Sequence, residues 1–122
     1  MQTRILAIDD SATMRALLQR ALGQHDFEVS LAEDGVEGLE KLTEVDPHLV
    51  ITDINMPRLD GFGVIEGVRQ DQTHARTPVL VLTTESGSDL KDRARRAGAT
   101  GWIVKPFDDA ALVGVIRRVL GV

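Results

Sequence analysis

Short apolar runs alternate with helical patterns along the whole chain. The apolar runs occupy five segments: Ile5–Ile8, Phe27–Leu31, Leu49–Thr52, Val79–Leu82 and Trp102–Val104. Three of them are continuously apolar, which is typical of strands covered on both faces of a parallel sheet. The second run alternates apolar and polar residues, and this pattern predicts a strand at the edge of the sheet.

The segment after the first strand predicts a helix with one buried stripe. Ser11 is placed to cap this helix at its amino end. Helical spacing puts five apolar side chains on the same stripe: Met14, Leu17, Leu18, Ala21 and Leu22. Gly23 can close the helix at its carboxyl end.

Four further helical patterns follow the remaining strands. They run near Val36–Leu42, after Gly61, near Ser88–Ala97 and after Asp108. Glycines at positions 61, 63 and 67 make the second of these helices intrinsically weak. The third offers little apolar surface for its length, whereas the fourth carries a regular apolar stripe.

This five-fold alternation of strand and helix predicts the fold class. It indicates an α/β domain, in which right-handed crossovers build a parallel sheet with helices on both faces. We find no internal repeat, low-complexity segment or linker. A length of 122 residues suits a single core, so we expect one domain over residues 1–122.

Composition narrows the function classes. The absence of cysteine excludes disulfides, thiolate metal sites and a cysteine nucleophile. A net charge of −5 and an aromatic content of 3% argue against a nucleic-acid-binding surface. No apolar run approaches the roughly 20 residues of a membrane span, and we recognise no signal peptide. We therefore expect a cytoplasmic protein that binds neither membranes nor nucleic acids.

Polar residues follow four of the predicted strands. Asp9 and Asp10 end the first, Asp53 the third, Thr83 the fourth and Lys105 the fifth. The carboxyl ends of parallel strands share one edge, and ligands bind there where the strand order reverses. If the first and third strands are neighbours, the three aspartates converge. Each residue alone has an ordinary structural role, such as a helix cap or turn, so the prediction rests on their combination.

The chemistry of this cluster points to a divalent cation and an anion. Neighbouring carboxylates repel one another, and an oxygen-only ligand set without histidine or cysteine suits Mg²⁺. A carboxylate can also act as a covalent nucleophile toward phosphoryl groups. Mg²⁺ and Lys105 would neutralise the charge that develops during in-line transfer.

The motifs "IDDS", "TDINMPRLDGF" and "VKPF", together with Thr83, resemble the receiver domain of two-component response regulators. The resemblance covers essentially the whole chain. It implies a flavodoxin-like (βα)5 doubly wound sandwich with strand order 2-1-3-4-5. It also implies a single receiver (response regulatory) domain over residues 1–122 without an output domain.

The resemblance assigns a role to each residue of the acidic cluster. Asp53 would be the phosphoacceptor, taking a phosphoryl group from the phosphohistidine of a sensor histidine kinase. Asp10, Asp53 and the backbone carbonyl of Asn55 would hold Mg²⁺, with Asp9 acting through a water molecule. Such a domain catalyses its own phosphorylation and dephosphorylation without turning over a free substrate, so we expect a signalling switch and not an enzyme.

By the same resemblance, Thr83 and Lys105 would contact the phosphoryl oxygens, and the Lys105–Pro106 peptide bond would be cis. Movement of the Thr83 hydroxyl toward the phosphate would leave space for the ring of Trp102. Asn55 and Glu85 would tune hydrolysis of the acyl phosphate.

The resemblance also implies an output face. It would comprise the helix near residues 88–97, the strand 102–104 and the helix after residue 108. Asn55, Glu85 and the motif "DDSATMR" resemble the CheY-like chemotaxis branch.

Several partners remain open at this point. The kinase would be a chemotaxis histidine kinase, and a phosphatase is a further expected partner. The target would be the flagellar motor switch protein. Alternatively, the chain would exchange phosphate with a histidine phosphotransfer protein, as a phosphorelay intermediate or phosphate sink. A nucleotide- or flavin-binding domain is disfavoured, because two acids after the first strand would repel a phosphate group that lacks a metal.

Overall fold

Five parallel strands form one sheet in the order β2-β1-β3-β4-β5 in the computed structural model, which describes residues 2–122. The strands are β1 (Thr3–Ile8), β2 (Phe27–Ala32), β3 (Leu49–Thr52), β4 (Val79–Thr83) and β5 (Gly101–Val104). This order confirms the predicted flavodoxin-like α/β fold, with β2 at an edge. Met1, the first residue of the predicted domain, lies outside the described residues.

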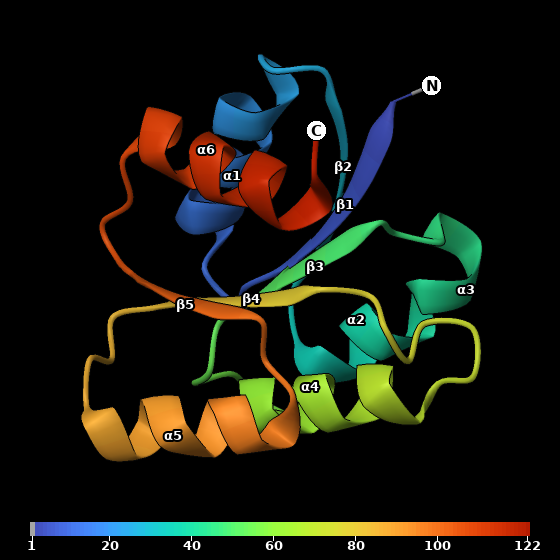
Figure 1. Cartoon of the computed structure of the whole chain (residues 1–122), viewed down its shortest axis with the longest axis vertical. Coiled ribbons are helices and arrows are strands. Elements are labelled where there is room, and N and C mark those ends of the chain that lie inside the picture. Colours follow the sequence, from blue (N-terminus) through green and yellow to red (C-terminus); the bar gives the residue numbers. More distant parts are fainter. Residues whose placement is uncertain (1) are drawn as a thin grey trace.

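The helices form two layers that cover opposite faces of the sheet (Figure 1). They are α1 (Ala12–Gly23), α2 (Gly35–Glu40), α3 (Leu42–Val45), α4 (Gly61–Gln70), α5 (Ser88–Ala97) and α6 (Asp109–Leu120). Helices α1 and α6 pack on one face, and α2 to α5 pack on the other. The sheet is therefore doubly wound, as the alternating pattern predicts.

The interior strands supply side chains to both cores because successive residues of a strand point to opposite faces. In β1, Ile5 and Ala7 belong to the core beneath α1 and α6, whereas Leu6 and Ile8 belong to the other core. All residues of β3 and β4 are buried. Burial on both faces explains why these strands read as continuous apolar runs.

Short polar side chains start most of the long helices. The Ser11 hydroxyl accepts a hydrogen bond from the backbone N–H of Met14 at 3.2 Å, which confirms the predicted cap of α1. Asp60 caps α4 and Asp108 caps α6 in the same way. Helix α5 differs, because it begins after Gly87 and has no side-chain cap.

Two expectations about α1 are wrong. Leu17 was expected in the buried stripe, but it is 45% exposed. A helix buries only the arc that faces the sheet, and Leu17 falls outside the arc defined by Leu18, Ala21 and Leu22. Gly23 lies within α1, and the turn into β2 uses Asp26, whose φ of 67° is left-handed.

The helix expected near Val36–Leu42 is broken into two pieces and extends to Val45. The break is at Lys41, whose backbone N–H is shared between the carbonyls of Glu37 and Gly38. Sharing of this kind marks a locally tightened turn. Helix α3 then continues the chain to Asp46, which closes it with a left-handed φ of 49°.

The glycines that weaken α4 also allow it to pack closely. A Cβ atom at Gly61 would overlap the carbonyl oxygen of Asp53 and lie 2.8 Å from the Cα of Ile54. A Cβ atom at Gly67 would lie 2.5 Å from a methyl group of Leu39 on α2. The glycines therefore lower the helix propensity of α4 but allow this helix to contact the end of β3 directly, next to Asp53.

Candidate functional site

Three aspartates meet at the carboxyl ends of β1 and β3. These strands are neighbours, with Ile8 opposite Thr52, so the residues that follow them lie side by side. One carboxylate oxygen each from Asp9, Asp10 and Asp53 lies within 4.8 Å of the others. Asp9 and Asp53 are buried and Asp10 is exposed. The predicted convergence of the acids is therefore present in the structure.

Lys105 supplies the positive charge that such a cluster needs. Its Nζ donates hydrogen bonds of 2.7 Å to Oδ2 of Asp9 and of 2.7 Å to Oδ2 of Asp53. Burial alone would lower the pKa of Lys105, but the hydrogen bonds to Asp53 and Asp9 outweigh it and raise that pKa above the ordinary value for lysine. The ammonium group therefore stays charged and offsets the repulsion between the two carboxylates.

The carboxylate of Asp53 is held in a defined orientation. Its Oδ1 accepts a 2.6 Å hydrogen bond from the backbone N–H of Ile54, and its Oδ2 accepts the bond from Lys105. The Asp53 side chain is 11% exposed. A carboxylate that is held in one orientation and keeps some access to solvent is well placed to act as a nucleophile.

Asp9 is anchored through both its side chain and its backbone. Its Oδ1 accepts a 2.9 Å hydrogen bond from the backbone N–H of Ser11. Its carbonyl oxygen accepts a 2.8 Å hydrogen bond from the guanidinium of Arg15. Arg15 is not among the predicted site residues. Arg15 lies one helical turn after the cap residue Ser11. This spacing would have indicated that its long side chain can reach the backbone at the end of β1.

A second group of predicted site residues meets at Glu85. The carboxylate of Glu85 accepts a 3.1 Å hydrogen bond from the amide of Asn55, and its carbonyl oxygen accepts a 3.0 Å bond from the indole N–H of Trp102. The backbone N–H of Glu85 donates to the hydroxyl of Thr83 at 3.3 Å. Glu85 thus connects Asn55, Thr83 and Trp102.

The side chain of Thr83 does not connect the residues around Glu85 to the acidic cluster and Lys105. Within residues 2–122, the Thr83 hydroxyl makes no hydrogen bond to Asp53 or Lys105. The link is through the backbone instead, because the N–H of Lys105 donates to the carbonyl of Thr83 at 2.7 Å. The Lys105–Pro106 peptide bond is cis, as expected.

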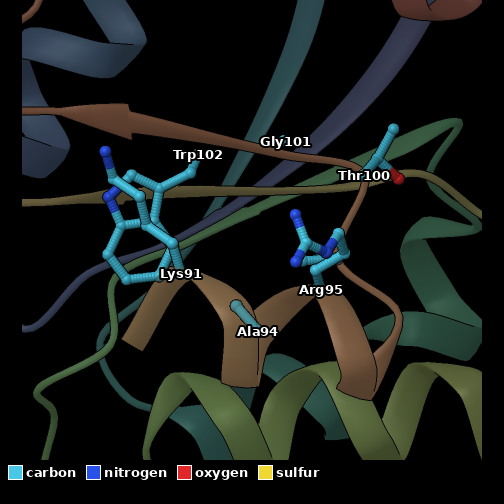
Figure 2. Close-up of a pocket in the computed structure, with 7 residues that line it drawn as sticks. Lys91, Ala94, Arg95, Thr100, Gly101 and Trp102 are labelled. Atoms are coloured by element: carbon cyan, nitrogen blue, oxygen red, sulfur yellow. The ribbon is translucent and has the colours of Figure 1, made fainter. Parts of the chain in front are cut away.

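A separate pocket lies between α5 and β5, next to this site. Figure 2 shows Lys91 of α5 beside Trp102 of β5, and Arg95 of α5 below Thr100. Its lining combines apolar side chains, such as Ala94 and Trp102, with the cationic side chains of Lys91 and Arg95. It belongs to the face that the resemblance assigns to output.

An ion pair that the sequence analysis missed lies beyond the acidic cluster. Arg58, in the segment between β3 and α4, binds both carboxylate oxygens of Asp34 at the start of α2. No periodicity or motif relates these positions, which are 24 residues apart.

Comparison with known proteins identifies the family. Residues 5–117 match the model of the response regulator receiver domain. The chain therefore belongs to the response regulator receiver domain family, whose members act as phosphoacceptor switches with histidine kinases.

Individual relatives agree with this assignment. The chemotaxis protein CheY1 of Helicobacter pylori is 38% identical over 120 residues, which cover 97% of this chain and 97% of that protein. The structure of the chemotaxis protein CheY4 of Vibrio cholerae superposes with a TM-score of 0.93 at 37% identity, covering 98% of this chain and 99% of that one. The signal receiver domain of a histidine kinase from Syntrophus aciditrophicus has a TM-score of 0.89 at 28% identity, with coverages of 98% and 90%.

The donor set of the acidic cluster fits Mg²⁺. Asp9, Asp10 and Asp53 offer oxygen ligands only, and hard divalent cations prefer such ligands. Across the helices of residues 2–122, none combines the length and apolar character needed to cross a membrane.

Proposed function

We propose that this chain is a phosphoacceptor switch in which Asp53 receives a phosphoryl group from the phosphohistidine of a sensor histidine kinase. The observation that carries the proposal is the meeting of Asp53 with Asp9, Asp10 and Lys105 at one edge of the sheet. Asp9, Asp10, Asp53 and the backbone carbonyl of Asn55 would hold Mg²⁺. When bound, Mg²⁺ supplies positive charge that stabilises the transferring phosphoryl group.

The transfer itself uses the carboxylate of Asp53. One of its oxygens forms a bond to phosphorus while the bond between phosphorus and the histidine nitrogen breaks, and the imidazole leaves with the electron pair. The product is an acyl phosphate on Asp53. Lys105 already contacts this carboxylate, and its flexible side chain can follow the negative charge onto the new phosphoryl oxygens. Hydrolysis at the same site would return the domain to its resting state.

The hydrogen bonds around Glu85 support a switch. A phosphoryl group next to Thr83 would offer its hydroxyl a stronger, charged acceptor. Rearrangement there would disturb Glu85, which contacts both Thr83 and Trp102. Asn55 and Glu85 lie on the same side of the site, where we propose that they control the approach of water and hence the lifetime of the acyl phosphate.

We propose that the output face comprises α5, β5 and α6 and binds the flagellar motor switch protein. Similarity to the chemotaxis protein CheY1 over 97% of both chains supports a role of this receiver domain in chemotaxis. The pocket in Figure 2 lies on this face and includes Trp102, the proposed switch residue. From the similarity to chemotaxis proteins we also propose a cytoplasmic location and a phosphatase as a further partner.

A second candidate function is a phosphorelay intermediate or phosphate sink. The similarity to a receiver domain of a histidine kinase favours it. In that case Asp53 exchanges phosphate with a histidine phosphotransfer protein. Rapid transfer in both directions, with no change in affinity for a motor-switch peptide on phosphorylation, would select this alternative over the chemotaxis target.

The decisive experiment follows the fluorescence of Trp102, the only tryptophan, and the mass of the protein. Mg²⁺ and then acetyl phosphate are added to the wild type and to Asp53→Asn. We expect Mg²⁺ to change the fluorescence, and acetyl phosphate to change it again and add a phosphoryl group only when Asp53 is present. Absence of both effects in the wild type would contradict the proposal.

A further inference from the structure

The segment between β3 and α4 (residues 54–60) is attached to the start of α2 by an ion pair. The guanidinium of Arg58 donates from Nε to Oδ2 of Asp34 at 2.8 Å and from Nη2 to Oδ1 at 3.0 Å. Paired hydrogen bonds of this kind fix distance and orientation together. In the described chain, this is the only ion pair that residues 54–60 make.

The acidic partner of this pair is buried, whereas the Arg58 side chain is 56% exposed. The Asp34 side chain is 9% exposed, and its Oδ1 also accepts a 2.8 Å hydrogen bond from the backbone N–H of Glu37. The hydrogen bond from Arg58 lowers the pKa of Asp34, so the carboxylate stays ionised. Arg58 has a left-handed φ of 67°, which a residue other than glycine keeps only where its surroundings hold it.

Backbone packing reinforces this attachment. A Cβ atom at Gly35 would overlap the carbonyl oxygen of Leu59 and lie 2.8 Å from its Cβ. Only a glycine at position 35 therefore lets the segment approach α2 this closely. Residues 54–60 are consequently held against α2. A hydrogen bond from the backbone N–H of Gly61 to the carbonyl of Ile54 also closes the segment at its base.

We infer that the Arg58–Asp34 pair positions the metal site by fixing the backbone carbonyl of Asn55. This inference rests on the proposed function, in which that carbonyl is a ligand of Mg²⁺. A carbonyl ligand has no side-chain rotamer with which to adjust, so its position follows the backbone of residues 54–60. Mg²⁺ tolerates little departure from octahedral geometry. Arg58 is thus a positioning residue that touches neither the ion nor the phosphoryl group.

The test is Mg²⁺ binding to the unphosphorylated protein, measured by isothermal titration calorimetry. Arg58→Asn is the sharpest variant, because asparagine adopts a positive φ more readily than most residues but is too short to reach Asp34. We expect its dissociation constant for Mg²⁺ to rise about tenfold, the lower end of the effect of residues that orient metal ligands. Arg58→Lys keeps the charge but loses the paired hydrogen bonds. Its dissociation constant for Mg²⁺ should lie between those of the wild type and of Arg58→Asn.

Arg4→Ala is the matched control. It removes the ion pair between Arg4 and Asp46, which joins the amino end of β1 to the end of α3. Thermal denaturation of each variant would show comparable losses of stability, whereas we expect the Mg²⁺ dissociation constant of Arg4→Ala to equal that of the wild type.

The outcomes separate the two proposals. If the wild type binds Mg²⁺ and Arg58→Asn binds it equally well, the positioning role is overturned and the proposed function stands. If Arg4→Ala weakens binding as much as Arg58→Asn, the effect is a general loss of stability and the positioning role is again overturned. If the wild type does not bind Mg²⁺, the proposed function fails and this inference fails with it.

Discussion

Lys105 interacts with two carboxylates that the proposed reaction also requires. Its ammonium group lies 2.7 Å from oxygens of both Asp9 and Asp53, where it offsets their repulsion. We propose that Mg²⁺ shares these carboxylates and that a phosphoryl group would add further anionic oxygens nearby. A compact charge on a flexible stem can move among such partners more easily than a planar guanidinium. This property suits lysine to a site whose charge changes during the reaction.

A buried histidine, His74, contacts two carboxylates away from the acidic cluster. His74 is 4% exposed, and its ring nitrogens lie 3.0 Å from Oδ1 of Asp71 and 2.9 Å from Oδ1 of Asp46. Each ring nitrogen thus has one carboxylate as its hydrogen-bond partner. The hydrogen bonds from His74 lower the pKa of Asp71 and of Asp46.

This arrangement predicts a pH-dependent effect of Asp71→Asn. Because the folded-state pKa of Asp71 lies below its unfolded value of 3.8, its contribution to stability is present above about pH 4 and is lost as the pH falls through the lowered value. We expect the loss of unfolding free energy in Asp71→Asn to be largest near neutral pH and to shrink below pH 4. Urea denaturation from pH 3 to 7 would measure it.

His74→Gln supplies the control for this prediction. His74→Gln removes the imidazole that contacts Asp71. In this background, Asp71→Asn should lower the unfolding free energy by less than it does in the wild type. An equal effect of Asp71→Asn with and without His74 would show that the pair does not interact energetically.

Among the helices, α4 is shaped by its contact with the strand that carries Asp53. We predict opposite effects of glycine-to-alanine substitution in α4 and α6. Gly61→Ala forces a Cβ atom into the backbone of Asp53 and should lower the unfolding free energy by about 1–3 kcal/mol. Gly114 in α6 has no atom near its would-be Cβ, so Gly114→Ala should raise it by up to about 1 kcal/mol. Urea denaturation would compare the two, and a gain in stability from Gly61→Ala would contradict the close packing.

Helix α5 is attached mainly at its carboxyl end. Ala94 is its only buried residue, which agrees with the thin apolar stripe seen in the sequence. Arg93 lies over the ring of Phe62 at 3.9 Å from the ring centre. Arg69 donates two hydrogen bonds, of 3.1 and 2.7 Å, to the carbonyl of Gly98 just after the helix. The amino end after Gly87 has no side-chain cap, and helix ends with few such contacts open locally at low cost.

We therefore predict that Arg69→Met loosens α5 in particular. Methionine keeps much of the apolar stem but loses the bonds to Gly98 and to Thr77, at a cost of about 2 kcal/mol. Amide hydrogen exchange should accelerate over residues 94–99 and stay unchanged in α1. Uniform acceleration across the chain would indicate a global loss of stability instead.

At the scale of the whole molecule, the strand order creates the site, because β1 and β3 are neighbours although α1, β2, α2 and α3 separate them in the chain. A ligand that binds only the folded site stabilises the entire domain. At a Mg²⁺ concentration one hundred times its dissociation constant, we expect the unfolding free energy to rise by about 2.7 kcal/mol. Urea denaturation in MgCl₂, against NaCl of equal ionic strength, would measure this gain.

Asp10→Asn provides the control for that measurement. Asp10 is exposed, so its substitution should disturb the fold little while removing one proposed ligand. We expect a much smaller gain from Mg²⁺ in this variant. An equal gain would mean that Mg²⁺ stabilises the protein without using the acidic cluster.

The sequence by itself determined the five strands and the polar residues that follow them, although not the break between α2 and α3. Strand burial and helix caps depend on spacings of a few residues, so patterns around Val79–Leu82 and Ser11 were sufficient to predict them. The motifs then implied the strand order, and with it the meeting of Asp9, Asp53 and Lys105. These features were predictable because each is encoded locally or by a motif that covers the whole chain.

Only the tertiary structure decided how the elements contact one another. The bonds from Trp102 to Glu85 and from Arg58 to Asp34 join residues 17 and 24 positions apart. The exposure of Leu17 depends on which arc of α1 meets the sheet. No periodicity reports such relations, because they depend on distances between elements that are set only when both cores are packed.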